Sequence, residues 1–131
     1  FNATDGCYHR EGRLRHCLPR LVGIGFAGSG TTSLASYLHA HPQLSYGEKK
    51  EHRLQDLFRT DADISAAKEE TIERGLCFEE AVRALYAAQW PFEVPEQAAT
   101  VAFDFDPTYA QNRHMPRVFA RLAPARATRL V

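Results

Sequence analysis

The chain has 131 residues, of which 44% are hydrophobic and 24% are charged, and its sixteen basic residues balance sixteen acidic ones. This composition is that of a folded domain. It excludes a disordered chain and a bulk electrostatic attraction to nucleic acid or to a membrane surface. No apolar run approaches the ~20 residues that span a bilayer, so a membrane anchor is expected only outside this chain.

Residues 1–19 are polar and are expected to form an irregular lead-in segment, followed by an α/β domain over residues 20–131. Cys7 and Cys17 lie in this lead-in segment. Their spacing is equally consistent with a disulfide and with two free thiols. The chain has no C-x-x-C pair and its six histidines are scattered, so no metal site is expected.

The domain begins with a short apolar run that predicts a strand over residues 20–25. A helix over residues 30–40 follows, which Pro42 ends, and residues 44–46 are expected to form a short second strand. Further elements are expected in this order: a helix at 61–74, an amphipathic helix at 78–86, a loop at 91–96, a strand at 100–105, a helix at 116–122 and a strand at 127–131. Strands separated by helices imply a parallel, three-layer α/β sheet.

The most informative segment is the glycine-rich turn between the first strand and its helix, which contains Gly23, Gly25, Gly28 and Gly30. The first N–H groups of a helix have no internal partner, and the helix dipole is positive at that end. Glycine also lets the backbone approach a ligand closely. The turn therefore predicts a site for the phosphate of a nucleotide.

Two well-known phosphate-binding patterns fit this turn incompletely. The glycines at 23, 25 and 28 fit G-x-G-x-x-G, the pattern of dinucleotide-binding folds, which also requires a carboxylate about 20 residues further on. Glu48 lies at that distance, but in a charged, turn-like context. The phosphate-loop pattern G-x-x-x-x-G-K-[ST] also fits, except that Thr31 occupies the position of the lysine.

A third pattern uses more of the chain. Gly28-Ser-Gly-Thr-Thr-Ser-Leu34 is followed by His41-Pro42, then by Lys50-Glu51, and later by Asp104-Phe-Asp-Pro-Thr-Tyr109. These ordered motifs resemble the sulfotransferases that use 3′-phosphoadenosine 5′-phosphosulfate (PAPS), and the last two resemble the carbohydrate branch of that family. Residues 115–131 look like the helix and strand that lead to the 3′-phosphate site. The resemblance implies a P-loop nucleoside-triphosphatase-like fold of which this chain is the front half, incomplete at its C-terminal side.

The resemblance also implies roles for individual residues. Glu51 matches the position of the catalytic base, Lys50 would hold the base or the sulfate, and His52 is a weaker alternative base. The 5′-phosphosulfate of the donor would be bound by six loop residues: Gly28, Ser29, Gly30, Thr31, Thr32 and Ser33. Gly28 stands where the family has a lysine beside the bridging oxygen. Lys49, Lys50 or an arginine outside this chain would then have to supply that charge.

The resemblance thus implies a sulfotransferase that moves a sulfuryl group from PAPS to a carbohydrate hydroxyl, and neither a metal nor a nucleic acid partner is expected. Two alternatives stay open: an NAD-type dinucleotide-binding oxidoreductase and a non-catalytic nucleotide-binding fragment. Tyr109 is expected either beside the site or in the core, and Trp90 either in the core or in an acceptor cleft. The Golgi lumen is expected by analogy with the carbohydrate branch, although the sequence leaves the cytoplasm open.

Overall fold

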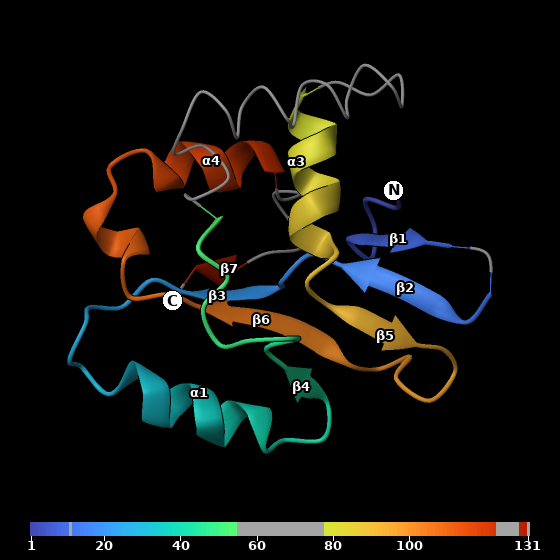
Figure 1. The fold of residues 1–131 in the computed structure, drawn as a ribbon, viewed down its shortest axis with the longest axis horizontal. Helices are drawn as coiled ribbons and strands as arrows, with labels where there is room; N and C mark the ends of the chain where they lie inside the picture. The colour runs from blue at the N-terminus through green and yellow to red at the C-terminus, as the bar shows by residue number, and fades with distance from the viewer. Residues whose placement is uncertain (11, 55–77, 123–128, 131) are drawn as a thin grey trace.

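The computed structural model describes residues 1–10, 12–54, 78–122 and 129–130, which form two β-sheets with helices packed on them (Figure 1). The helix expected over residues 61–74 lies outside the described residues. In chain order, the described elements are β1 (Cys7–His9), β2 (Leu14–Cys17), β3 (Leu21–Gly23), α1 (Thr31–His39), β4 (Leu44–Ser45), α3 (Phe78–Ala87), β5 (Pro91–Glu93), β6 (Val101–Phe105), η2 (Tyr109–Gln111), α4 (Met115–Leu122) and β7 (Arg129–Leu130).

The larger sheet has four parallel strands in the order β4-β6-β3-β7. Each of these strands lies within a stretch that the sequence analysis expected to be a strand. β3 occupies an inner position, because Leu21 pairs with Phe103 of β6 on one side and with Arg129 of β7 on the other. The glycine-rich turn thus leaves the sheet from the carboxyl end of an inner strand.

Helices lie on both faces of the parallel sheet, with α1 on one side and α3 and α4 on the other (Figure 1). β6 shows how the sequence separates the two faces, since successive side chains of a strand point in opposite directions. Phe103 and Phe105 pack with Ala35 of α1, whereas Ala102 belongs to the cluster that contains Phe119 of α4. Asp104 shares the face of Ala102 and is fully buried.

The smaller sheet corrects two expectations. The segment expected to be irregular, residues 1–19, contains β1 and β2, and the expected loop at 91–96 begins with β5. The three strands pair antiparallel in the order β1-β2-β5. These strands have three or four residues each, too few for a clear alternation, and β5 lies more than 70 residues away from β2 in the chain. Pairing between such distant segments leaves no local pattern in the sequence.

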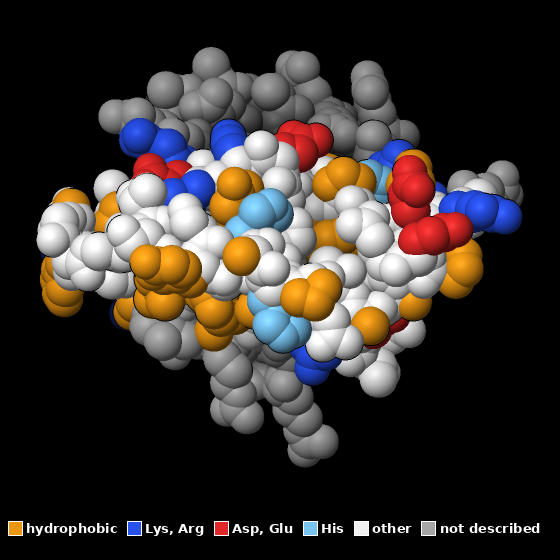
Figure 2. Space-filling model, turned by 90° about the horizontal axis from the view of Figure 1, so that it is seen from below, with side chains coloured by type: hydrophobic (Ala, Val, Ile, Leu, Met, Phe, Trp, Pro, Cys, Tyr) orange, Lys and Arg blue, Asp and Glu red, His pale blue; other side chains and the backbone are white. Residues whose placement is uncertain are grey.

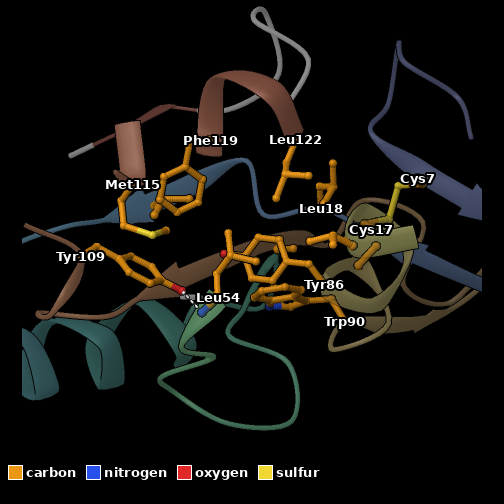
Figure 3. Packing of buried hydrophobic residues seen from close by; sticks show 14 of the residues in the cluster. Cys7, Cys17, Leu18, Leu54, Tyr86, Trp90, Tyr109, Met115, Phe119 and Leu122 are labelled. Carbon is orange, nitrogen blue, oxygen red and sulfur yellow. Dashed lines mark hydrogen bonds between the residues drawn. A yellow bond between two sulfur atoms is a disulfide. The ribbon is translucent and has the colours of Figure 1, made fainter. Parts of the chain in front are cut away.

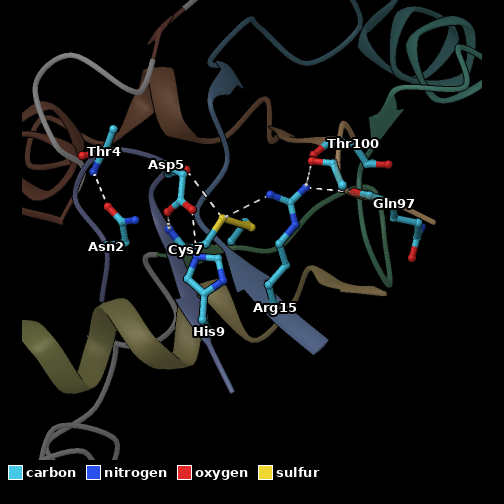
Figure 4. A network of polar contacts seen from close by, with 10 residues as sticks. Asn2, Thr4, Asp5, Cys7, His9, Arg15, Gln97 and Thr100 are labelled. Atoms are coloured by element: carbon cyan, nitrogen blue, oxygen red, sulfur yellow. Dashed lines mark hydrogen bonds and ion pairs between the residues drawn. A yellow bond between two sulfur atoms is a disulfide. The ribbon is translucent and has the colours of Figure 1, made fainter. Parts of the chain in front are cut away.

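A disulfide between Cys7 and Cys17 joins β1 to β2, and the two residues are also register partners in the sheet. Of the two states that the sequence left open for these cysteines, the structure therefore has the disulfide. Next to it, the guanidinium of Arg15 donates to the carbonyl oxygens of Gln97 (2.9 Å) and Thr100 (3.1 Å), which attaches the hairpin to the approach of β6 (Figure 4).

The main hydrophobic core lies between the parallel sheet, α3, α4 and the disulfide (Figure 3). Trp90 is fully buried there, and its indole N–H donates to the Phe103 carbonyl at 3.2 Å. Its ring also meets the ring of Tyr86 edge to face, with centroids 5.1 Å apart. Trp90 is thus a core residue, and the alternative assignment to an acceptor cleft is wrong because no face of the side chain is exposed.

Candidate functional site: the glycine turn and its neighbours

The glycine-rich turn folds back on itself immediately after β3. The backbone N–H of Ser29 donates to the Phe26 carbonyl at 3.2 Å, and the Ser29 hydroxyl donates to the same oxygen at 2.5 Å. Gly28 has a φ of 79°, in the left-handed region. A positive φ at the third residue of a four-residue turn favours a residue without Cβ, which explains the glycine.

The turn ends at the N-terminus of α1. Gly30 is the N-cap residue with a φ of 84°, and no side chain caps the helix. The first hydrogen bond into the helix is from the Leu34 N–H to the Gly30 carbonyl at 3.0 Å. The N–H groups of the three residues between them therefore have no acceptor within the helix. With no acidic residue in the first turn, this end of α1 can receive an anion.

The hydroxyl residues of the first turn differ in exposure. Thr31 is 8% exposed, whereas Thr32 and Ser33 are exposed to solvent. A methyl group on Gly25 would lie 3.4 Å from Cγ2 of Thr31, so the turn packs closely over this residue. The side chains of Thr32 and Ser33 are thus accessible to a ligand, whereas that of Thr31 is covered by the turn.

Exposed apolar side chains lie on the face of the molecule that carries the glycine turn and α1 (Figure 2). The exposed fractions are 67% for Phe26 in the turn, 46% for Leu34 and 77% for Tyr37, and the last two lie three residues apart on α1. Residues at this spacing share one face of a helix. The candidate anion site therefore lies beside an apolar surface.

Lys50 and Glu51 form an ion pair after β4, with Nζ 2.6 Å from Oε1. Their side chains are 20% and 40% exposed. The carboxylate is therefore accessible to a substrate while its charge is balanced by a neighbouring ammonium. In the described part of the chain, neither side chain has a hydrogen bond or ion pair with residues 28–33.

His52 is buried, unlike these two neighbours. Its Nε2 lies 2.6 Å from the Tyr46 carbonyl, which only accepts, so Nε2 carries a proton. Nδ1 lies 3.4 Å from the side-chain oxygen of Gln89, and the ring packs on Trp90 with centroids 4.1 Å apart. These contacts favour a structural role for His52 over the role of a base.

A buried polar cluster lies behind this segment and was not assigned to the site from sequence. Oδ2 of Asp104 accepts hydrogen bonds from the hydroxyls of Tyr86 and Tyr109, both at 2.6 Å. Burial raises the pKa of the Asp104 carboxyl, although the two tyrosine hydrogen bonds act in the opposite direction. Burial and the charge of Asp104 also raise the pKa of both hydroxyls, so both stay protonated donors near neutral pH. The available signal was a carboxylate within the otherwise apolar strand β6.

The structure brings the ends of the two inner strands together. The N–H of Asp106, directly after β6, donates to the carbonyl of Gly23 at the end of β3, at 3.2 Å. Asp106 then accepts from the N–H and hydroxyl of Thr108, which turns the chain toward Tyr109. Tyr109 is buried in the core and also contacts the segment after β4 through Leu54. Of its two expected locations, the structure therefore has the core.

Other candidate sites are weaker in the described part of the chain. A cavity of about 160 Å³ lies beside the disulfide, lined by Asp5, Arg15 and Arg20 among others, and none of the residues assigned to the site from sequence borders it. No cluster of three or more potential metal ligands occurs among the described residues. None of the described helices is long and apolar enough to cross a membrane.

Comparison with known proteins gives one informative similarity. The chain is 49% identical over 45 residues to the membrane-associated sulfotransferase kil1 of Dictyostelium discoideum. The aligned segment covers 34% of this chain and 9% of that protein. No family model matches the chain, and no solved structure matches it significantly. About a third of the chain is thus similar to part of a sulfotransferase.

Proposed function

We propose that this chain forms the donor-binding part of a sulfotransferase that transfers the sulfuryl group of PAPS to a carbohydrate hydroxyl, on a P-loop nucleoside-triphosphatase-like fold. The observation that carries the proposal is the glycine turn, which leaves an inner parallel strand and ends at an uncapped helix N-terminus. Ligands of open α/β sheets bind at this edge, at the carboxyl ends of the strands. The partial similarity to a sulfotransferase supports the same assignment.

Each part of the site has a chemical task in this proposal. The N–H groups at the start of α1 and the hydroxyls of Thr32 and Ser33 hold the 5′-phosphosulfate. Glu51 removes the proton from the acceptor hydroxyl, since its carboxylate is 40% exposed. Lys50 orients that carboxylate and neutralises charge on the sulfuryl group. Lys50 thereby replaces in part the lysine that the sulfotransferases have at the position of Gly28.

The strand order argues against the dinucleotide alternative. In that fold the second strand lies directly beside the first, so the acidic residue at its end can reach the ribose of a nucleotide bound at the first turn. Glu48 does follow β4, but β6 lies between β4 and β3. The carboxylate is therefore one strand too far from the glycine turn for this function.

We also propose that the protein works in an oxidising compartment such as the Golgi lumen. The support is the disulfide between Cys7 and Cys17, because structural disulfides persist in secretory compartments and are rare in the cytosol.

Calorimetric titration with adenosine 3′,5′-bisphosphate and with NAD tests the donor assignment. The bisphosphate should bind and NAD should not. Thr32→Val, which removes one hydroxyl without changing the side-chain shape, should weaken bisphosphate binding ~10-fold, the effect of losing a hydrogen bond to a charged group. Ser36→Ala, an exposed hydroxyl further along α1, is the matched control and should have no effect.

A labelled PAPS donor then separates an enzyme from a binding module. Transfer of label to a carbohydrate acceptor supports the enzyme, and Glu51→Gln should abolish that transfer while leaving bisphosphate binding intact. Binding without transfer would favour the non-catalytic nucleotide-binding fragment. Binding of NAD in place of the bisphosphate would refute the proposal.

A further inference from the structure

The backbone after the Lys50–Glu51 pair is hydrogen-bonded to the side chain of Tyr109. The N–H of Leu54 donates to the Tyr109 hydroxyl at 3.0 Å (Figure 3). The hydroxyl in turn donates to Oδ2 of Asp104 at 2.6 Å. A hydroxyl has one proton and two lone pairs, so these two contacts are compatible and fix its orientation. Leu54 and Asp104 are fully buried, and Tyr109 is 1% exposed.

Tyr109 is itself held firmly. It begins the short helix η2, and its N–H donates to the Asp106 carbonyl at 3.2 Å, only two residues beyond the sheet residue Asp104. Its ring meets that of Phe119 in α4 edge to face, with centroids 5.3 Å apart. The Tyr109 hydroxyl is thus held in a fixed position relative to the carboxyl end of β6.

The segment that Tyr109 holds, residues 52–54, is under backbone strain. Arg53, between His52 and Leu54, has a φ of 49° and is the single non-glycine residue with a positive φ in the described ranges. A side chain makes this conformation unfavourable, and it persists only where the surrounding structure enforces it. Both neighbours of Arg53 are anchored: His52 by the Tyr46 carbonyl and Leu54 by Tyr109.

We propose that Tyr109 is a positioning residue for Glu51. Its hydroxyl joins the Leu54 N–H to the Asp104 carboxylate and so fixes the position of Glu51 relative to the carboxyl end of β6. This inference rests on the proposed function. Glu51 is three residues from Leu54, with the strained Arg53 between them. Release of the Leu54 N–H would let the strain relax and would displace the carboxylate. A displacement of about 1 Å can lower a reaction rate ~100-fold.

The test compares two tyrosines that share one acceptor. Tyr109→Phe removes the hydroxyl that receives the Leu54 N–H, whereas Tyr86→Phe removes the other hydroxyl on Asp104 and leaves that N–H bonded. Both changes delete one buried hydroxyl group. Circular dichroism and urea unfolding establish first that each variant folds.

Amide hydrogen exchange reads the attachment directly. In the wild-type chain the Leu54 amide should be protected, and in Tyr109→Phe it should exchange at least ~10-fold faster, as expected for a lost hydrogen bond. Tyr86→Phe should leave its exchange unchanged. An unprotected Leu54 amide in the wild type, or equal exchange in the two variants, would overturn the proposal without any measurement of activity.

Transfer from labelled PAPS reads the consequence. Tyr109→Phe should lower kcat between ~10-fold and ~100-fold with the donor KM changed less than ~3-fold, because the donor loop is untouched. Tyr86→Phe should keep both constants within ~3-fold of wild type. Faster exchange at Leu54 with an unchanged kcat would refute the positioning role alone. A wild-type chain that neither binds the bisphosphate nor transfers sulfate would refute the proposed function, and the positioning role with it.

Discussion

The conformation of Gly28 yields a quantitative prediction about the loop. At a φ of 79°, any residue with a Cβ adopts an unfavourable backbone, which costs about 1 kcal/mol. A Cβ placed there would meet no heavy atom within 4 Å, so no steric cost is added. Gly28→Ala should therefore lower the free energy of unfolding by about 1 kcal/mol, and Gly28→Lys by the same amount within ~0.5 kcal/mol, because the longer side chain extends into solvent.

Urea unfolding followed by circular dichroism measures these free energies. Gly25→Ala is the matched control, since Gly25 has no positive φ and its Cβ would make an ordinary contact of 3.4 Å with Thr31. That variant should be neutral or more stable by a few tenths of a kcal/mol, as is usual where alanine fits the backbone. If Gly28→Ala behaved like Gly25→Ala, the left-handed conformation would be refuted.

The same Gly28 variants test the alignment with the sulfotransferases. Because Ala and Lys impose equal backbone strain, the difference in bisphosphate affinity between them isolates the effect of the ammonium group. The Lys variant should bind at least as tightly as the Ala variant, because the family places a lysine at this position. Weaker binding by Gly28→Lys than by Gly28→Ala would contradict the alignment of Gly28 with the lysine of the sulfotransferases.

Two further predictions concern stability. The disulfide closes a loop with a sequence separation of 10 residues, so Cys7→Ala combined with Cys17→Ala should lower the unfolding free energy by about 2.7 kcal/mol; equal urea midpoints for wild type and variant without reductant would contradict this. Burial raises the pKa of the Asp104 carboxyl, so the folded state binds the carboxyl proton more tightly than the unfolded chain does. The stability that results is fully present below about pH 4, the ordinary pKa of an aspartate. It is lost as the pH rises through the raised pKa of the folded state. Asp104→Asn should remove this decline. Urea unfolding of the wild type and of Asp104→Asn at a series of pH values measures this decline. If the difference between their unfolding free energies did not change with pH, the effect would be excluded.

The sequence was sufficient where the signal is local. The strands of the parallel sheet, α1 and the glycine turn follow from short apolar runs, from helical spacing and from glycines two or three residues apart. The positive φ of Gly28 and Gly30 is a second reason for glycine in this turn, beside the close approach to a ligand that the sequence suggested. The roles of Lys50 and Glu51 rest on the resemblance and stay predictions, because nothing local distinguishes a base from a solvated charge.

Tertiary structure decided what depends on pairing between distant residues. β5 pairs with β2 across more than 70 residues, and the state of Cys7 and Cys17 depends on the register of β1 with β2. His52 was a weaker alternative base in sequence, and only the folded structure shows it buried against Trp90. Likewise, the sequence shows an aspartate within an apolar strand, but only the folded chain brings two tyrosine hydroxyls to Asp104, one of which also accepts from the Leu54 N–H. Local patterns determine which backbone forms, whereas burial and hydrogen-bond partners are set by residues that meet only in the folded chain.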